Sequence, residues 1–165
     1  MKRIAALILA SVLLISSNPL LAGTPNYNPS KFEYEDLTSG KVVSYTMIFF
    51  QNDTDEINIT RLEVSGMTMY GLQLRYSGSN WRFLEGLTVK ADEEVIQLNL
   101  ISPPTRDVLD NGKGVSEVLN FMLTDGQASK ITSAAEVKVQ YYGVPNTVDE
   151  KGVANLNKFY EEFIK

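Results

Sequence analysis

Alternating apolar and polar positions predict β-strands in the first two thirds of the chain. In residues 41–50, the apolar side chains of one parity are Val43, Tyr45, Met47 and Phe49. This period of two is typical of a half-buried strand. A polar turn at 51–56 precedes a second strand, where the apolar positions switch parity after Ile59. The switch predicts a β-bulge near residues 60–61.

The clearest pattern is a three-stranded meander over residues 72–100, with polar turns at 77–80 and 92–94. Within each strand the apolar side chains share one parity: Leu72, Leu74 and Tyr76; Trp81, Phe83, Leu87 and Val89; Ile96, Leu98 and Leu100. Rings that face each other across two strands stabilise the pair. We therefore predict that Trp81 and Phe83 point inward, the alternative being that Trp81 stacks on a ligand.

Helical spacing appears after a long loop at residues 102–114. Apolar residues at 115, 118, 119, 122 and 123 predict a short amphipathic helix, and residues 128–136 predict another helical turn. A last strand at 137–141 precedes a C-terminal helix that Asp149 opens. Strands first and helices late predict an α+β fold. We expect a mainly antiparallel sheet, as a meander or sandwich-like, with two or three helices, one of them C-terminal.

The N-terminus fits an export signal. Lys2 and Arg3 precede an apolar run over residues 4–15, and small residues follow at 22–23. The run is shorter than the roughly 20 residues of a spanning helix, which favours cleavage over a retained anchor. Thr24 occupies the position where a lipoprotein signal requires cysteine. We predict a signal peptide at 1–23, a flexible mature N-terminus at 24–33 and one exported domain at 34–165.

These boundaries predict a periplasmic or secreted protein without stable membrane insertion after cleavage. The chain has 165 residues, with 15 basic and 20 acidic side chains and a formal net charge of −5. This balance argues against nucleic acid as a partner. It also argues against anionic membrane surfaces, which attract clustered basic side chains.

Two residue types are missing from the whole sequence, cysteine and histidine. Their absence excludes disulfides, Ser-His-Asp and Cys-His nucleophiles, and ordinary zinc or copper sites. We expect neither a metal nor a cofactor.

Glu85 is the first candidate for a binding residue, because continuous alternation places it on an apolar face between Phe83 and Leu87. A buried carboxylate without a partner is costly and has a raised pKa. Either Gly86 marks a bulge that turns the carboxylate outward, or Glu85 anchors a ligand in a pocket. A salt bridge would also satisfy it, with three candidate partners: Arg75, Arg82 and Arg106.

The loop at 102–114 supplies two further candidates, Arg106 and Asp107. A guanidinium group binds a carboxylate or phosphate through two hydrogen bonds, and long loops are often functional. The alternative is that Arg106 ties the loop to the sheet. With Trp81 and Glu85, these residues are the candidate site for a ligand or partner.

Three stretches resemble a loose group of small exported bacterial proteins of unknown function, many of them lipid-anchored. They are YSGSNWRF (76–83), SPPTRDV (102–108) and ITSAAEVKV (131–139). The resemblance covers about residues 70–165 and implies an exported bacterial α+β domain. It supplies no catalytic residue.

The sequence therefore predicts a non-catalytic domain that binds a protein or a cell-envelope component. The first alternative is a small-ligand binder with a pocket between sheet and helices. The second is a glycan hydrolase that uses paired carboxylates. The acidic groups at 33–36, 53–56, 92–94 and 161–162 lie in turns or on a polar helix face, where we expect solvated charge.

Overall fold

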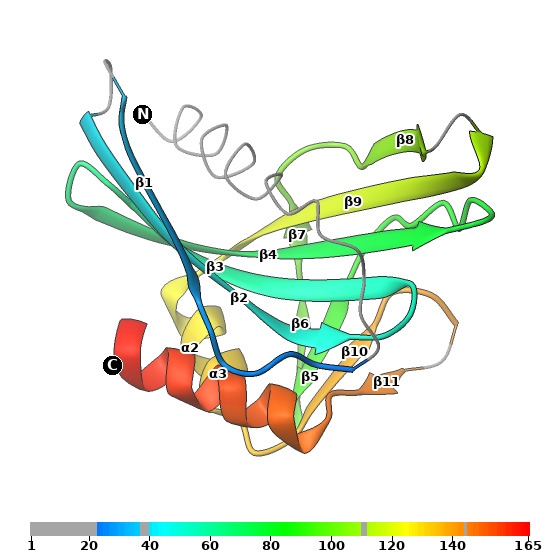
Figure 1. Ribbon diagram of the computed structural model, residues 1–165. Helices are drawn as coiled ribbons and strands as arrows, with labels where there is room; N and C mark the ends of the chain where they lie inside the picture. Colours follow the sequence, from blue (N-terminus) through cyan, green and yellow to red (C-terminus); the bar gives the residue numbers. More distant parts are fainter. Residues whose placement is uncertain (1–22, 37–39, 110–111, 144) are drawn as a thin grey trace.

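The computed structural model describes residues 23–36, 40–109, 112–143 and 145–165. These residues form two antiparallel sheets and two helices (Figure 1). The signal peptide predicted at 1–23 lies, apart from Gly23, outside them. Within these ranges, no helix is long and apolar enough to cross a membrane.

The large sheet has seven strands and begins as a meander of β1 to β4. Strand β9 pairs with β4, and β7 and β8 both pair with β9 along its other side. The strands are β1 (Ser30–Asp36), β2 (Gly40–Gln51), β3 (Asp55–Val64), β4 (Met67–Gly78), β7 (Asn99–Leu100), β8 (Thr105–Leu109) and β9 (Gly114–Leu123).

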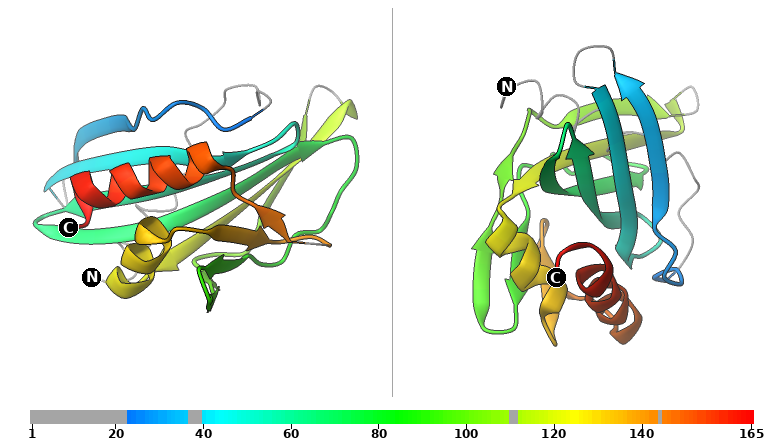
Figure 2. Two further views of the ribbon diagram at one scale, coloured as in Figure 1. Left: turned by 90° about the horizontal axis from the view of Figure 1, so that it is seen from below. Right: turned by 90° about the vertical axis from the view of Figure 1, so that its left-hand side faces the viewer.

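The small sheet has four strands in the order β11-β10-β5-β6. They are β5 (Thr88–Ala91), β6 (Glu94–Gln97), β10 (Val137–Gln140) and β11 (Asn146–Thr147). The helices are α2 (Asp125–Ser133) and α3 (Glu150–Phe163), and both lie on one face of the large sheet (Figure 2). The predicted fold class is thus confirmed: mostly antiparallel sheet with two helices, one of them C-terminal.

Local sequence determines where several elements begin and turn. Ser65 and Gly66, both with positive φ, form the two-residue connection between β3 and β4, as tight hairpins require. Thr124 and Gln127 form a capping box at the start of α2. The Asp149 side chain accepts the backbone N–H of Gly152 at 2.7 Å and caps α3.

The main hydrophobic core lies between the large sheet, the helices and the small sheet. Its largest buried side chains include Phe49 of β2, Phe121 of β9 and Phe159 of α3. Helix α3 approaches β2 closely at Gly152, where a Cβ atom would overlap the carbonyl oxygen of Phe49. The interior between sheet and helices is therefore filled by side chains.

The predicted helix at residues 115–123 is wrong, because these residues form strand β9. Val115, Leu119, Phe121 and Leu123 alternate into the main core, while Met122 packs on the opposite face. A strand that is buried on both sides carries apolar residues on both parities. In β9 the apolar residues at 115, 118, 119, 122 and 123 therefore match the spacing of a helix, although the segment is a strand.

The predicted hairpin of residues 72–76 with 81–89 is also wrong. Strand β4 pairs with β3 and β9, and residues 81–87 form no strand. The chain instead crosses from the large sheet to the small one, where β5 pairs with β6 and β10. A turn-rich stretch between two apolar runs thus connects two sheets here, not two neighbouring strands.

The parity switch in β3 reflects burial on both faces of the large sheet. Ile59 packs in the main core, whereas Leu62 and Val64 join a second apolar cluster with Val42. No bulge occurs at residues 60–61, where β3 pairs continuously with β4. The register shift lies in β2, between Ile48 and Phe50.

Two predicted loops contain strands. Residues 30–36 form the edge strand β1, so the N-terminal segment expected at 24–33 is ordered into the sheet from Ser30 onward. Residues 105–109 of the predicted loop form β8, which pairs with β9. The turn-forming residues around both strands obscured their short alternation.

Candidate functional site

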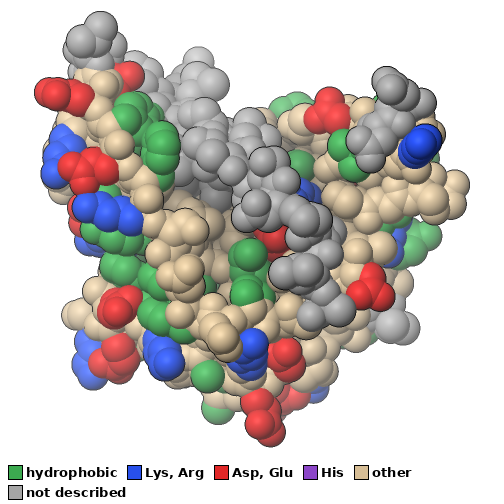
Figure 3. Space-filling model, in the orientation of Figure 1, with side chains coloured by type: hydrophobic (Ala, Val, Ile, Leu, Met, Phe, Trp, Pro, Cys, Tyr) green, Lys and Arg blue, Asp and Glu red, His purple; other side chains and the backbone are tan. Residues whose placement is uncertain are grey.

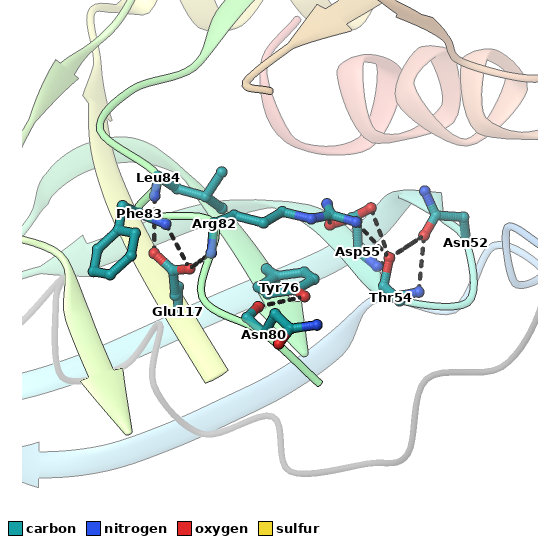
Figure 4. A network of polar contacts seen from close by, with 9 residues as sticks. All are labelled: Asn52, Thr54, Asp55, Tyr76, Asn80, Arg82, Phe83, Leu84 and Glu117. Atoms are coloured by element: carbon teal, nitrogen blue, oxygen red, sulfur yellow. Dashed lines mark hydrogen bonds and ion pairs between the residues drawn. The ribbon is translucent and has the colours of Figure 1, made fainter. Parts of the chain in front are cut away.

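The connection between the two sheets, residues 79–87, is held by one buried carboxylate. We call these residues the crossover. Glu117 of β9 is fully buried and accepts the backbone N–H groups of Arg82 at 2.6 Å, Phe83 at 2.9 Å and Leu84 at 2.8 Å. The Nε group of Arg106 donates a fourth hydrogen bond at 3.2 Å. Figure 4 shows the three N–H groups converging on the two carboxylate oxygens.

The four donors keep Glu117 ionised. Burial by itself would raise the pKa of this carboxyl group, but the backbone N–H groups of Arg82, Leu84 and Phe83 and the Arg106 side chain outweigh it. The pKa of Glu117 is therefore held below its usual value. Each hydrogen bond to a charged group contributes about 1.5–3 kcal/mol, so the crossover is firmly fixed to β9.

Phe83 projects from the crossover into solvent. Its backbone has a φ of +55°, and its side chain is 63% exposed. A left-handed conformation costs a bulky L-residue roughly 1–2 kcal/mol. The neighbouring Leu84 turns the other way and is buried. The crossover therefore has a strained backbone at Phe83, and this conformation points one large ring outward.

The prediction that Trp81 and Phe83 both point inward is wrong for Phe83 and correct only in part for Trp81. Trp81 is half-buried and packs against the main core. Its ring centroid lies 6.3 Å from that of Phe83. The positive φ at Phe83 breaks the alternation that placed the two rings on one face.

Arg106 lies beside Phe83 and connects the crossover to β8. Its guanidinium carbon lies 5.6 Å from the Phe83 ring centroid, and its Nη2 group donates to the carbonyl of Leu84 at 3.1 Å. The side chain is one third exposed. Val108, two positions along β8 and on the same face, is 63% exposed.

These residues form a continuous candidate site, which we call the Phe83 surface: Phe83, Arg106, Val108 and the outer edge of β8. Every residue of β8 is exposed, and in the described ranges β8 pairs only with β9. One side of its backbone is therefore open to another strand.

The four residues predicted for the site do not all meet there. Arg106 lies at its centre, and Trp81 supports Phe83 from the core side. Asp107 is exposed on β8, where it pairs in register with Ser116. Glu85 is exposed on the crossover. It is therefore not a buried anchor, and it is exposed without a β-bulge, because residues 81–87 form no strand.

Each of the three arginines considered as partners for Glu85 pairs with a different acid. Arg82 Nη1 lies 2.7 Å from Asp55 Oδ1, and Arg75 Nη2 lies 3.5 Å from Glu56 Oε2. Arg106 pairs with Glu117, as described above. Asp55 and Glu56 are buried, so the expectation of solvated charge is wrong for these two carboxylates.

Sequence reasoning missed Glu117, although a signal for it was present. If residues 115–123 are read as a strand, alternation places Glu117 on the core face between Val115 and Leu119. The helix predicted from residues 115, 118, 119, 122 and 123 leaves Glu117 outside the apolar set. The positive φ of Phe83 had no signal, because glycine or asparagine usually marks such positions.

No family model matches the chain, and neither a curated protein nor a solved structure shows significant similarity to it. In the described part of the chain, no three acidic side chains cluster in a way that could hold a metal ion.

Proposed function

We propose that this protein is a non-catalytic binding domain that docks an extended segment of another protein on the Phe83 surface. The observation that carries the proposal is the backbone of Phe83. A buried carboxylate with four donors holds an exposed phenylalanine in a strained conformation. Strain at a surface residue that the surrounding structure enforces is typical of functional positions.

The chemistry of this surface favours a polypeptide strand as the partner. The open edge of β8 offers backbone donors and acceptors, which an added strand uses for affinity. Phe83 and Val108 offer apolar contacts, and aromatic and arginine side chains are the residue types that dominate binding energy at interfaces. Arg106 donates through Nε and Nη2, and its side chain is one third exposed, so the guanidinium group remains accessible to a carboxylate. We therefore expect an extended segment with an acidic residue near apolar ones.

The proposed export of the domain rests on the N-terminal signal, which makes an envelope or secreted protein the expected partner. A hydrolytic role is less well supported. A general acid needs a raised pKa, whereas the pKa of Glu117 is lowered and its oxygens are occupied by donors. Asp55 is likewise engaged, with Arg82 and Thr54.

Quantitative affinity capture from the native envelope tests the proposal, with the protein lacking residues 1–23 as bait. A specific partner should be captured by the wild-type bait and by Val95→Ala, a control in the exposed part of β6. Phe83→Ala and Val108→Lys should each reduce its capture at least tenfold. The purified partner should then bind wild type and Val95→Ala more tightly than it binds Phe83→Ala and Val108→Lys.

Hydrogen exchange on the purified complex distinguishes strand addition from other docking. We expect the amides of residues 105–109 to exchange more slowly when the partner is bound. The proposal is wrong if no captured protein depends on Phe83, or if the partner leaves exchange in β8 unchanged.

A further inference from the structure

Two surface hollows share a pair of tyrosines, Tyr141 and Tyr142, which follow directly after β10. The first, of about 430 Å³, is lined by the turn Asn52–Asp55, Arg82, Tyr141, Tyr142 and Asn146. The second, of about 370 Å³, is lined by residues of β5, β6 and β10 and shares both tyrosines. Each volume lies within the roughly 300–1,000 Å³ of small-molecule sites.

Tyr142 presents a large exposed ring between the two hollows. Its side chain is 59% exposed, and the guanidinium carbon of Arg82 lies 5.4 Å from its centroid. The same guanidinium group lies 4.1 Å from the ring centroid of Tyr76. Contact with a fixed cation limits the freedom of the Tyr142 ring, which lowers the entropy cost of stacking a ligand on it.

Two of the charged groups that line the first hollow, Asp55 and Arg82, neutralise each other. Asp55 accepts from Arg82 Nη1 at 2.7 Å and from Thr54 Oγ1 at 3.0 Å. Figure 4 shows Arg82 reaching across to Asp55 and Thr54. Burial and the nearby Asp55 charge raise the pKa of Tyr141 well above its usual value, so its hydroxyl group stays neutral.

The second hollow is lined entirely by uncharged residues: Gly86, Leu87, Thr88, Gln97, Leu98, Gln140, Tyr141, Tyr142 and Gly143. The Gln140 side chain donates to the carbonyl of Gly143 at 2.9 Å, which holds its amide beside the tyrosines. The exposed carboxylate of Asp53 is the one acidic group at the rim of the first hollow that no arginine neutralises.

From this arrangement we infer that the Tyr141–Tyr142 surface binds a neutral oligosaccharide. Amide, hydroxyl and carboxylate groups recognise sugar hydroxyls through hydrogen bonds, while an exposed tyrosine ring packs against the apolar face of a pyranose. A charged ligand fits less well, because Arg82 is paired with Asp55 and Asp53 repels anions. Two hollows that share one aromatic pair suit a chain of sugars, one part on each side of Tyr142.

Isothermal titration of the protein lacking residues 1–23 with chitohexaose, maltohexaose and cellohexaose tests the inference. At least one of these should bind, and Tyr142→Leu should weaken its binding tenfold or more. Tyr142→Phe should stay within threefold of wild type, because it keeps the ring. Phe32→Ala, which removes an exposed ring on β1, should have no effect.

Three results would overturn the inference. They are no binding of any of the three sugars, equal binding by Tyr142→Leu, or tighter binding of an oligogalacturonate, which would show an anion site. Thermal unfolding of each variant establishes that it is folded before titration. The linings of the two hollows include none of Phe83, Arg106 and Val108, so either proposal can fail while the other holds.

Discussion

Glu117 shows how one residue organises the candidate site. Its carboxylate binds three consecutive N–H groups of the crossover and the side chain of Arg106. Alternation predicted a carboxylate on an apolar face at Glu85, which is exposed, whereas the buried carboxylate of the structure is Glu117. The helix predicted for residues 115–123 hid Glu117, because only the alternation of a strand places this residue on the core face. The left-handed Phe83 could not be predicted, since that geometry results from tertiary contacts.

Replacing Glu117 with glutamine should lower the free energy of unfolding by about 1–3 kcal/mol, since hydrogen bonds to a charged acceptor are lost. The side-chain amide also turns a donor toward backbone donors. Urea denaturation at pH 7 measures the change. Glu85→Gln, an exposed carboxylate on the same crossover, is the matched control and should change stability by less than about 0.5 kcal/mol. Equal effects of the two substitutions would contradict the anchoring role.

The lowered pKa of Glu117 predicts a dependence of stability on pH. A carboxyl group whose pKa is lower in the folded state contributes stability above its unfolded pKa of about 4.3, and this contribution is lost as the pH falls through the folded pKa. Wild type should therefore lose more stability than Glu117→Gln between pH 6 and pH 3. Parallel stability curves for the two proteins would refute this prediction.

Glycine should suit position 83 better than alanine. At a φ of +55° a β-carbon is strained, whereas glycine is not. We expect Phe83→Gly to be up to about 1 kcal/mol more stable than Phe83→Ala, although both remove the exposed ring. Thermal unfolding of the two variants provides the comparison, and greater stability of the alanine variant would mean that the backbone is not held there.

At the scale of elements, strand β2 and helix α3 were predicted close to their observed bounds, and Asp149 caps α3 as expected. Helix α2 spans Asp125–Ser133, so it begins and ends three residues before the helical turn predicted at 128–136. Strand β9 was missed because both of its faces are covered. The crossover was missed because strand pairing depends on contacts far apart in the sequence, which alternation does not encode.

The close packing of α3 on β2 leads to a prediction about Gly152. An alanine there would overlap the carbonyl of Phe49, so Gly152→Ala should destabilise the protein by about 1–3 kcal/mol. Gly126→Ala in α2 is the matched control, because nothing lies near its position and alanine favours helix by up to about 1 kcal/mol. The two substitutions should shift the melting temperature in opposite directions. A Gly152→Ala variant as stable as wild type would mean that α3 does not pack this closely on β2.

At the scale of the whole molecule, Arg82 connects the two proposed surfaces. Its backbone N–H binds Glu117 of the large sheet, and its side chain binds Asp55 beside the tyrosine hollow. The core between the sheets and helices then serves as a rigid support. We propose that recognition takes place on the outside, on an edge strand with an exposed ring and on a pair of tyrosines.

The most direct test of this account is amide hydrogen exchange of Arg82, Phe83 and Leu84, measured by NMR. We predict slow exchange of all three in wild type, although the crossover forms no strand. In Glu117→Gln all three should exchange much faster, while amides in the centres of β3 and β4 stay protected. Fast exchange of these amides in wild type, or unchanged protection in the variant, would show that Glu117 does not hold the crossover and would contradict the account.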